Sequence, residues 1–292
     1  MRPYPSKSVP ASGRRKPEWL KVRLPQGGLS LQVSSVVRRH RLHTICSSGL
    51  CPNQGECWSC GTATFLICGD TCTRACRFCH VKTGRPLPPD AQEPANIARS
   101  VQLLQLRHVV ITSVDRDDLE DFGAAHWASV INAVKAANPG TTMETLIPDF
   151  QGRRDLIDMI IQARPEVISH NLETVRRLSG SVRSRRASYE TSLGVIGQVA
   201  ASGVTAKSGI MLGLGETHEE VIETMDDLRK AGCGVMTIGQ YLQPSKRNME
   251  VTEYVHPDVF EAYRRTGMEK GFAHMESSPL TRSSYHAERH AG

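Results

Sequence analysis

Residues 62–81, TATFLICGDTCTRACRFCHV, contain the features that decide the fold of this chain. The short apolar run at 62–68 predicts a buried strand. A loop follows with Cys72, Cys76 and Cys79 in the pattern C-x3-C-x2-C, and the aromatic Phe78 precedes the last cysteine. In parallel barrels, the loops after the carboxyl ends of the strands carry the functional site. The sequence therefore predicts a metal centre at the carboxyl end of a barrel strand.

Beyond this loop, strand-like and helix-like stretches alternate, which is the pattern of a parallel sheet with crossover helices. The predicted strands are 108–114, 142–147, 166–169, 205–212, 235–242 and 272–276. The predicted helices are 95–106, 124–137, 154–163, 189–201, 219–231 and 258–270. With strand 62–68 this gives six or seven βα units, too few for a closed eight-fold barrel. We expect an α/β protein built on a partial (β/α)6 TIM-type barrel over 62–278, with an N-terminal extension at 1–61 and a C-terminal tail at 279–292.

The cysteines are concentrated before and within this loop. Eight of the nine lie between Cys46 and Cys79, and an odd count in a large chain favours metal binding over disulfides. Cys46, Cys51 and Cys57 form a second triplet, C-x4-C-x5-C. Three thiolates are one fewer than a structural zinc site or an ordinary four-iron cluster takes, so each triplet leaves one coordination position open. The alternative is a zinc site built from C-x2-C pairs among Cys57, Cys60, Cys72 and Cys76.

The bulk composition restricts the setting of the protein. Hydrophobic residues make up 39% of the 292 residues, and no apolar run approaches the roughly 18 residues of a membrane helix. The N-terminus is basic, but its prolines interrupt the amphipathic helix of a transit peptide, so we expect an extended arm and a cytoplasmic protein, with organelle import as the alternative. The net charge of +6 points weakly to an acidic partner. The densest basic runs, at 38–41 and 183–186, lack interleaved aromatic residues, so we expect no nucleic-acid binding.

The C-x3-C-x2-C loop resembles the signature of the radical S-adenosylmethionine (SAM) superfamily, and the rest of the chain resembles the lipoyl synthase family within it. The resemblance extends from KPEWLKVRLP at 16–25 to RSSYHA at 282–287. It also includes CPNQGECWSCGTATFLICGDTCTRACRFC, VVITSVDRDDL, METLIPDF, PEVISHNLETV, KSGIMLGLGET and TIGQYLQPS.

The resemblance implies two [4Fe-4S] clusters and S-adenosyl-L-methionine as cofactors. Cys72, Cys76 and Cys79 would hold the cluster that cleaves SAM to a 5′-deoxyadenosyl radical, which removes hydrogen from C6 and C8 of a protein-bound octanoyl chain. Cys46, Cys51 and Cys57, with Ser283 of the terminal RSS motif, would hold an auxiliary cluster that is consumed as the sulfur source. Because a serine oxygen suits iron less well than a thiolate does, its bond should be labile.

SAM contacts are expected at the carboxyl ends of the strands. We predict that Thr112 and Ser113 bind its methionine end, Glu144 its amine, and Asn171 with Glu173 its sugar, with Lys207 as a further candidate. Helix capping or a strand-end role is the structural alternative for these residues. We expect Cys60, Cys68 and Cys233 to act as small apolar side chains, and His80 not to be a ligand.

The resemblance also implies partner proteins. The octanoyl carrier would be a lipoyl domain or the glycine cleavage H protein, docking on basic residues around 183–186, and a ferredoxin or flavodoxin would supply electrons. Alternative functions are another sulfur-inserting radical enzyme, such as a biotin synthase or a methylthiotransferase, or a non-catalytic zinc-binding module. The first group lacks the upstream cysteine triplet together with a terminal RSS motif.

Overall fold

A computed structural model gives the fold of the chain and describes residues 8–11, 15–21, 28–39, 42–59 and 64–290. Its centre is an eight-stranded sheet in the order β12-β10-β9-β8-β7-β6-β3-β2. All neighbouring pairs from β3 to β12 are parallel, and only β2 runs antiparallel, on β3. The bounds are β2 His43–Thr44, β3 Thr64–Ile67, β6 His108–Ser113, β7 Thr142–Leu146, β8 Val167–Ser169, β9 Thr205–Leu212, β10 Val235–Gln240 and β12 His274–Ser277.

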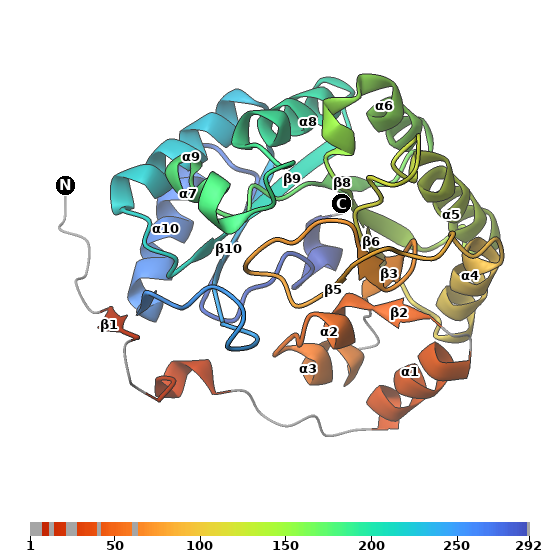
Figure 1. Cartoon of the computed structure of the whole chain (residues 1–292), viewed down its shortest axis with the longest axis horizontal. Coiled ribbons are helices and arrows are strands. Elements are labelled where there is room, and N and C mark those ends of the chain that lie inside the picture. The colour runs from red at the N-terminus through yellow and green to blue at the C-terminus, as the bar shows by residue number, and fades with distance from the viewer. Residues whose placement is uncertain (1–7, 12–14, 22–27, 40–41, 60–63, 291–292) are drawn as a thin grey trace.

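The helices between these strands form an arc outside the sheet (Figure 1). They are α4 Glu93–Leu103, α5 Ala124–Ala137, α6 Arg154–Gln162, α7 Arg176–Val182, α8 Tyr189–Ala201, α9 His218–Lys230 and α10 Pro257–Glu269. Each parallel strand before β12 is followed by a helix, which gives six βα units and a final strand. The sheet ends at β12 and β2 instead of closing on itself. The prediction of a partial (β/α)6 barrel is therefore confirmed.

The strands are buried on both faces, as expected for a parallel sheet covered by helices. Every residue of β3 and of β10 is buried. The helices begin at local capping signals: Ser188 caps α8, and Thr217 with Glu220 forms a capping box at α9. Gly232 follows α9 at φ +84°, a conformation that favours glycine, and lets the chain turn back into β10.

The N-terminal segment lies across the side of the barrel that the helical arc leaves open (Figure 1). Within it, a small apolar cluster of Val33, Cys46 and Trp58 is separate from the barrel core. The segment contains β1 Val9–Pro10, η1 Glu18–Leu20, α1 Gly28–Arg39, α2 Ile45–Ser48 and α3 Gln54–Ser59, and β1 pairs with β11 Glu253–Tyr254. Apart from the extended arm that includes β1, the sequence did not predict these elements.

The C-terminal tail runs into the barrel, and the part of it that the structure describes ends with η3, Ala287–His290. The backbone of Thr281 passes so close to Gly239 that a Cβ there would lie 2.1 Å from the Thr281 oxygen. His290 is buried and lies near His108 and His274, the first residues of β6 and β12. The tail therefore fills the interior at the amino ends of the strands. Within the described residues, none of the helices has the length and apolarity needed to span a membrane.

Candidate active site

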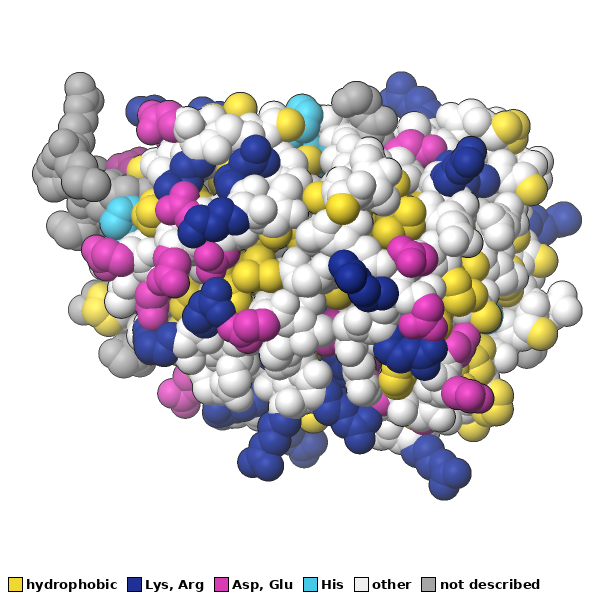
Figure 2. Space-filling view, turned by 90° about the horizontal axis from the view of Figure 1, so that it is seen from above, with side chains coloured by type: hydrophobic (Ala, Val, Ile, Leu, Met, Phe, Trp, Pro, Cys, Tyr) yellow, Lys and Arg dark blue, Asp and Glu magenta, His cyan; other side chains and the backbone are white. Residues whose placement is uncertain are grey.

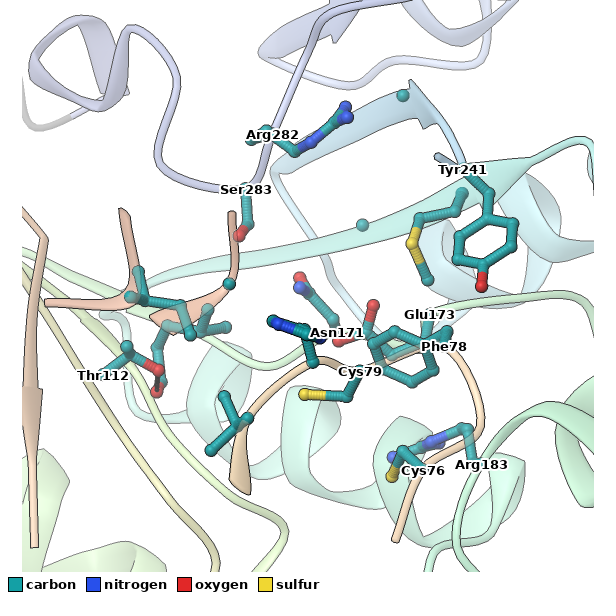
Figure 3. Close-up of a pocket in the computed structure, with 18 of the residues that line it drawn as sticks. Cys76, Phe78, Cys79, Thr112, Asn171, Glu173, Arg183, Tyr241, Arg282 and Ser283 are labelled. Carbon is teal, nitrogen blue, oxygen red and sulfur yellow. Dashed lines mark hydrogen bonds between the residues drawn. The ribbon is translucent and has the colours of Figure 1, made fainter. Parts of the chain in front are cut away.

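A cavity of about 620 Å³ opens at the carboxyl ends of the strands. Its size is within the range of small-molecule sites. Its wall includes the cysteine loop at 72–81 and residues 281–283 of the tail. Ile45, Gly49, Leu50 and Pro52, neighbours of Cys46 and Cys51 in the chain, also line it. Figure 3 shows the Cys79 thiol and the Ser283 hydroxyl both directed into this space. The structure thus brings the C-x3-C-x2-C loop and the RSS motif to one cavity.

Backbone N–H groups donate hydrogen bonds to two of the sulfur atoms in the 72–79 loop. The amides of Arg74 and Asp115 donate to Cys72 Sγ at 3.4 and 3.3 Å, and the amide of Ser184 donates to Cys76 Sγ at 3.3 Å. Such hydrogen bonds stabilise thiolate and tune iron–sulfur clusters. Burial raises the pKa of Cys72 and Cys76 to about 12 and that of Cys79 to about 11. A bound metal centre would offset this by deprotonating the thiols, so the donor set fits a cluster.

Arg74, inside the cysteine loop, fixes the loop to the barrel. Its guanidinium makes two hydrogen bonds to Asp117 (2.8 and 2.9 Å) and two to Asp149 (both 2.8 Å), and lies 3.3 Å from Asp115. The Arg74 side chain is only 4% exposed. The Thr73 hydroxyl adds a hydrogen bond to the Asp117 carboxylate at 3.0 Å. This buried network joins the loop to the segments after β6 and β7.

Arg74, Asp117 and Asp149 are present in conspicuous segments of the sequence, but the sequence does not show that they form ion pairs with one another. Contact with Arg74 keeps the pKa of Asp117 near 2 and the pKa of Asp149 below its usual value, against the opposing effect of burial. The only signal in the sequence was that acidic residues follow two predicted strands, in VDRDDL and IPDF.

The first triplet lies on α2, the turn after it and α3, where Cys46 is buried and Cys51 and Cys57 are half-buried. Two hydrogen bonds attach the tail to this region on either side of Ser283. Asn53 Nδ2 donates to the Leu280 carbonyl at 2.7 Å, and the Tyr285 hydroxyl donates to Glu56 at 3.1 Å. Burial raises the pKa of Cys51, and the nearby charge of Arg282 opposes this. The RSS motif is therefore held beside the first triplet.

Four of the predicted SAM contacts line the cavity: Thr112, Ser113, Asn171 and Glu173. The hydroxyls of the first two are already bonded, Thr112 donating to the Leu146 carbonyl (3.0 Å) and Ser113 accepting from Trp127 (3.1 Å). Asn171 Oδ1 is buried without a hydrogen-bond partner, so it is free to accept from a ligand. Glu173 adopts φ +68°, fixed by backbone bonds to Gly209 and Met211, and such strain is common at functional sites.

Glu144 and Lys207 do not line the cavity, so their predicted role as SAM contacts needs correction. Both are fully buried, and Lys207 Nζ donates to the two Glu144 oxygens at 2.9 and 2.7 Å. His290 of the tail lies 3.2 Å from the same ammonium. The physical reason is position: Glu144 is in the middle of β7 and Lys207 is near the start of β9, below the strand ends that face the cavity. Glu144 and Lys207 therefore form a buried ion pair with each other.

The structure places the remaining cysteines and the basic run as follows. Cys68 and Cys233 are buried in the apolar core, and Cys60 lies outside the described residues. His80 is exposed on the cavity wall. Arg183 was expected at the surface with Arg185 and Arg186, but it is buried and bonds to Ser192 at 2.9 Å.

The zinc alternative gains no support from this arrangement. In the part of the chain that the structure describes, no three His, Cys, Asp or Glu side chains converge closely enough to hold one metal ion. A zinc ion bonded to sulfur at about 2.3 Å needs such convergence, whereas a four-iron cluster spans a wider set of thiols.

Comparison with known proteins agrees with the site. The profile of the radical SAM superfamily matches residues 66–228. Lipoyl synthase of Treponema denticola is 66% identical over 95% of each chain. Lipoyl synthases of Porphyromonas gingivalis and Parabacteroides distasonis are 61% and 60% identical, each over 94% of this chain and 98% of theirs.

Solved structures show the same fold at low identity. Streptococcus suis SuiB bound to its precursor peptide aligns with a TM-score of 0.57 at 11% identity, over 85% of this chain and 52% of that one. Methylornithine synthase aligns with a TM-score of 0.54 at 12% identity, over 87% and 79%. Membership of the superfamily implies SAM and a four-iron cluster as cofactors. The matches over nearly the whole length show that this chain belongs to the lipoyl synthase family of radical SAM sulfurtransferases.

Proposed function

We propose that this protein converts a protein-bound octanoyl group into a lipoyl group by inserting sulfur at C6 and C8. The observation that carries the proposal is the single cavity bounded by the C-x3-C-x2-C loop, by the segment beside the first cysteine triplet and by Ser283. A chain held there would lie between two candidate cluster sites. The family membership supplies the reaction class.

We assign the SAM-binding cluster to Cys72, Cys76 and Cys79, and the auxiliary cluster to Cys46, Cys51, Cys57 and Ser283. When bound, the first cluster with SAM supplies radical chemistry at unactivated C–H bonds, and the second supplies the sulfur. The domain division at 1–61, 62–278 and 279–292 then separates the auxiliary-cluster segments from the barrel.

The protein itself binds, orients and shields the reactants. The unpaired Asn171 oxygen and the Glu173 carboxylate can accept hydrogen bonds from hydroxyl or amine groups of SAM. Apolar lining residues such as Val114, Ile147 and Met211 suit an alkyl chain and limit the access of water. Gly209 on the cavity wall leaves no room for a side chain, because a Cβ there would lie 2.3 Å from the Thr237 hydroxyl.

The family implies a carrier protein and a reductant in general terms. We propose that the carrier is a lipoyl domain or a glycine cleavage H protein, that a ferredoxin or flavodoxin supplies electrons, and that the enzyme works in the cytoplasm. Neither a membrane nor a nucleic acid is required.

The test is anaerobic incubation of the reconstituted protein with SAM, dithionite and an octanoyl-lysine peptide, followed by mass spectrometry. We expect the peptide to gain the mass of two sulfur atoms. A Cys46→Ala, Cys51→Ala, Cys57→Ala variant should still cleave SAM but insert no sulfur. Full sulfur insertion by that variant, or none by the natural protein, would refute the proposal.

A further inference from the structure

Three loops at the mouth of the cavity carry exposed basic side chains. Arg77 lies in the cysteine loop, Arg185 and Arg186 follow α7, and Lys246 with Arg247 follow β10, and all five are exposed. We name these five residues the basic rim. Each loop also supplies a cavity-lining residue within two positions of a rim residue: Cys76, Ala187 and Pro244.

Backbone hydrogen bonds hold the three loops together at Arg77. Its amide donates to the Val182 carbonyl at 2.9 Å, and its carbonyl accepts from the Met249 amide at 2.9 Å. Its guanidinium also donates to the Ser181 carbonyl at 3.3 Å. The basic rim is therefore one continuous surface instead of three separate loop tips. In Figure 1, these loops lie on the same face of the barrel as the cysteine loop.

The charge of the rim is barely neutralised. Residues 74–79, 181–187 and 244–249 contain no Asp or Glu, and the next residue, the exposed Glu250, forms no ion pair with a rim residue in the described part of the chain. The one ion pair between a rim residue and an acid among the described residues joins Arg186 to Asp117 at 3.5 Å, and Asp117 is already held by Arg74. On the helix-covered face, by contrast, Lys and Arg are interspersed with Asp and Glu (Figure 2). Away from the rim, Arg177 and Glu220 form an ion pair in which the two charges neutralise each other.

We propose that the basic rim is the docking surface for an acidic face of the carrier domain, with the octanoylated lysine entering the cavity beside it. This inference rests on the proposed function and specifies its substrate. The rim borders the mouth that the octanoyl arm must enter, so a protein bound there delivers the arm directly. Residues 181–187 and 244–249 contain no aromatic residue, and Phe78 beside Arg77 lines the cavity, so the rim is a poor surface for single-stranded nucleic acid.

The test compares two variants of the reconstituted enzyme that carry the same charge change. The rim variant combines Arg185→Glu, Lys246→Glu and Arg247→Glu. The control combines Arg99→Glu, Arg107→Glu and Lys230→Glu, all exposed on the outer surface. Each enzyme is assayed with dithionite on an octanoylated carrier domain and on a short octanoyl-lysine peptide, so that no protein electron donor is involved.

We expect the rim variant to raise KM for the carrier about tenfold or more, with kcat/KM for the peptide unchanged, because rim charges govern encounter with a charged partner. The control should match the natural enzyme. Salt should raise the carrier KM of the natural enzyme and hardly affect the rim variant. An unchanged carrier KM, or an equal loss on the peptide, would overturn the docking role. Tighter binding of a single-stranded RNA than of the carrier would also overturn it. No sulfur insertion into either substrate by the natural enzyme would instead reject the proposed function.

Discussion

The two cysteine loops are held in place by different forces. The 72–79 loop is locked to the barrel by Arg74, whose guanidinium bonds to two almost fully buried carboxylates. The 46–57 segment has a small apolar cluster of its own and is attached to the RSS tail by two hydrogen bonds, Asn53 to Leu280 and Tyr285 to Glu56. The first loop is held by buried ion pairs, whereas the second is held by apolar contacts and by hydrogen bonds to residues 280–285 of the tail.

This difference matches the proposed chemistry of the two sites. A site that cleaves SAM repeatedly gains from charge-assisted bonds, which are stronger and more directional than neutral ones. A site whose cluster gives up sulfur must be emptied and refilled. The hydrogen bonds on either side of Ser283 are weaker than the Arg74 network, so the RSS motif can separate from the triplet while the end of the tail stays packed in the barrel.

The largest expected effect comes from removing Arg74. Arg74→Met would leave Asp117 and Asp149 buried without their partner, which typically costs about 3–5 kcal/mol of unfolding free energy. Chemical denaturation of the apoprotein should show this loss, and the reconstituted variant should fail to cleave SAM. Arg77→Met, three residues away and exposed, is the matched control and should change the unfolding free energy by less than about 1 kcal/mol. Equal stability of the two variants would mean that the Arg74 network does not lock the loop.

The second prediction concerns the tail attachments. Asn53→Ala combined with Tyr285→Phe removes both flanking hydrogen bonds, worth about 1 kcal/mol each. We expect iron in the anaerobically reconstituted protein to fall from about eight towards about four per chain. SAM cleavage should persist while sulfur insertion is lost. The control, Thr141→Val with Ser277→Ala, removes two similar hydrogen bonds elsewhere and should keep all the iron. Loss of SAM cleavage in the first variant would show that the two loops are not independent.

How much of this was predictable from the sequence depends on the range of the interactions. The strands and outer helices follow from local periodicity and capping, and helices α5 and α8 match their predicted bounds 124–137 and 189–201. The cysteine triplets follow from spacing. The pairing of Arg74 with Asp149 and of Glu144 with Lys207 joins residues 75 and 63 positions apart, and no local pattern encodes it.

The predictions that the structure corrects, for Glu144, Lys207 and Arg183, failed because the sequence does not show where a side chain points in the folded protein. Glu144 and Lys207 were predicted to contact SAM because both lie on strands, but their depth along the strand decides which end of the barrel they face. Arg183 was predicted at the surface because it belongs to a basic run, yet it turns inwards to Ser192. Charge composition does not give the direction of a side chain.

A third prediction uses pH to ask whether the end of the tail unfolds with the barrel. Burial, followed by the charge of Lys207, lowers the pKa of His290 to about 3, and burial with the charge of Arg183 lowers that of His170 to about 4. Both stay neutral in the folded protein, whereas the unfolded chain binds protons below about pH 6.5. Each therefore makes the unfolding free energy fall by about 1.4 kcal/mol per pH unit as the pH drops from 6.5 towards 4.

Denaturation at several pH values tests this with single substitutions. His290→Gln and His170→Gln should each make the pH dependence shallower by the contribution of one histidine. His170 lies in the barrel wall, bonded to Ile147 and Ser192, and reports on the barrel alone. If only His170→Gln changes the pH dependence of the unfolding free energy, then the tail around His290 detaches before the barrel unfolds.

The smallest effect is expected at Cys233, which lies in neither loop. Its thiol is fully buried and donates to the Val235 carbonyl at 3.2 Å, and burial raises its pKa to about 12. Because this thiol lies in the apolar core, away from both cysteine triplets, we expect it not to ligate iron. Cys233→Ala should lower the unfolding free energy by about 1 kcal/mol through a small cavity and leave the iron content of the reconstituted protein unchanged. Loss of iron would mean that the barrel core, and not the loops alone, sets how tightly the clusters are held.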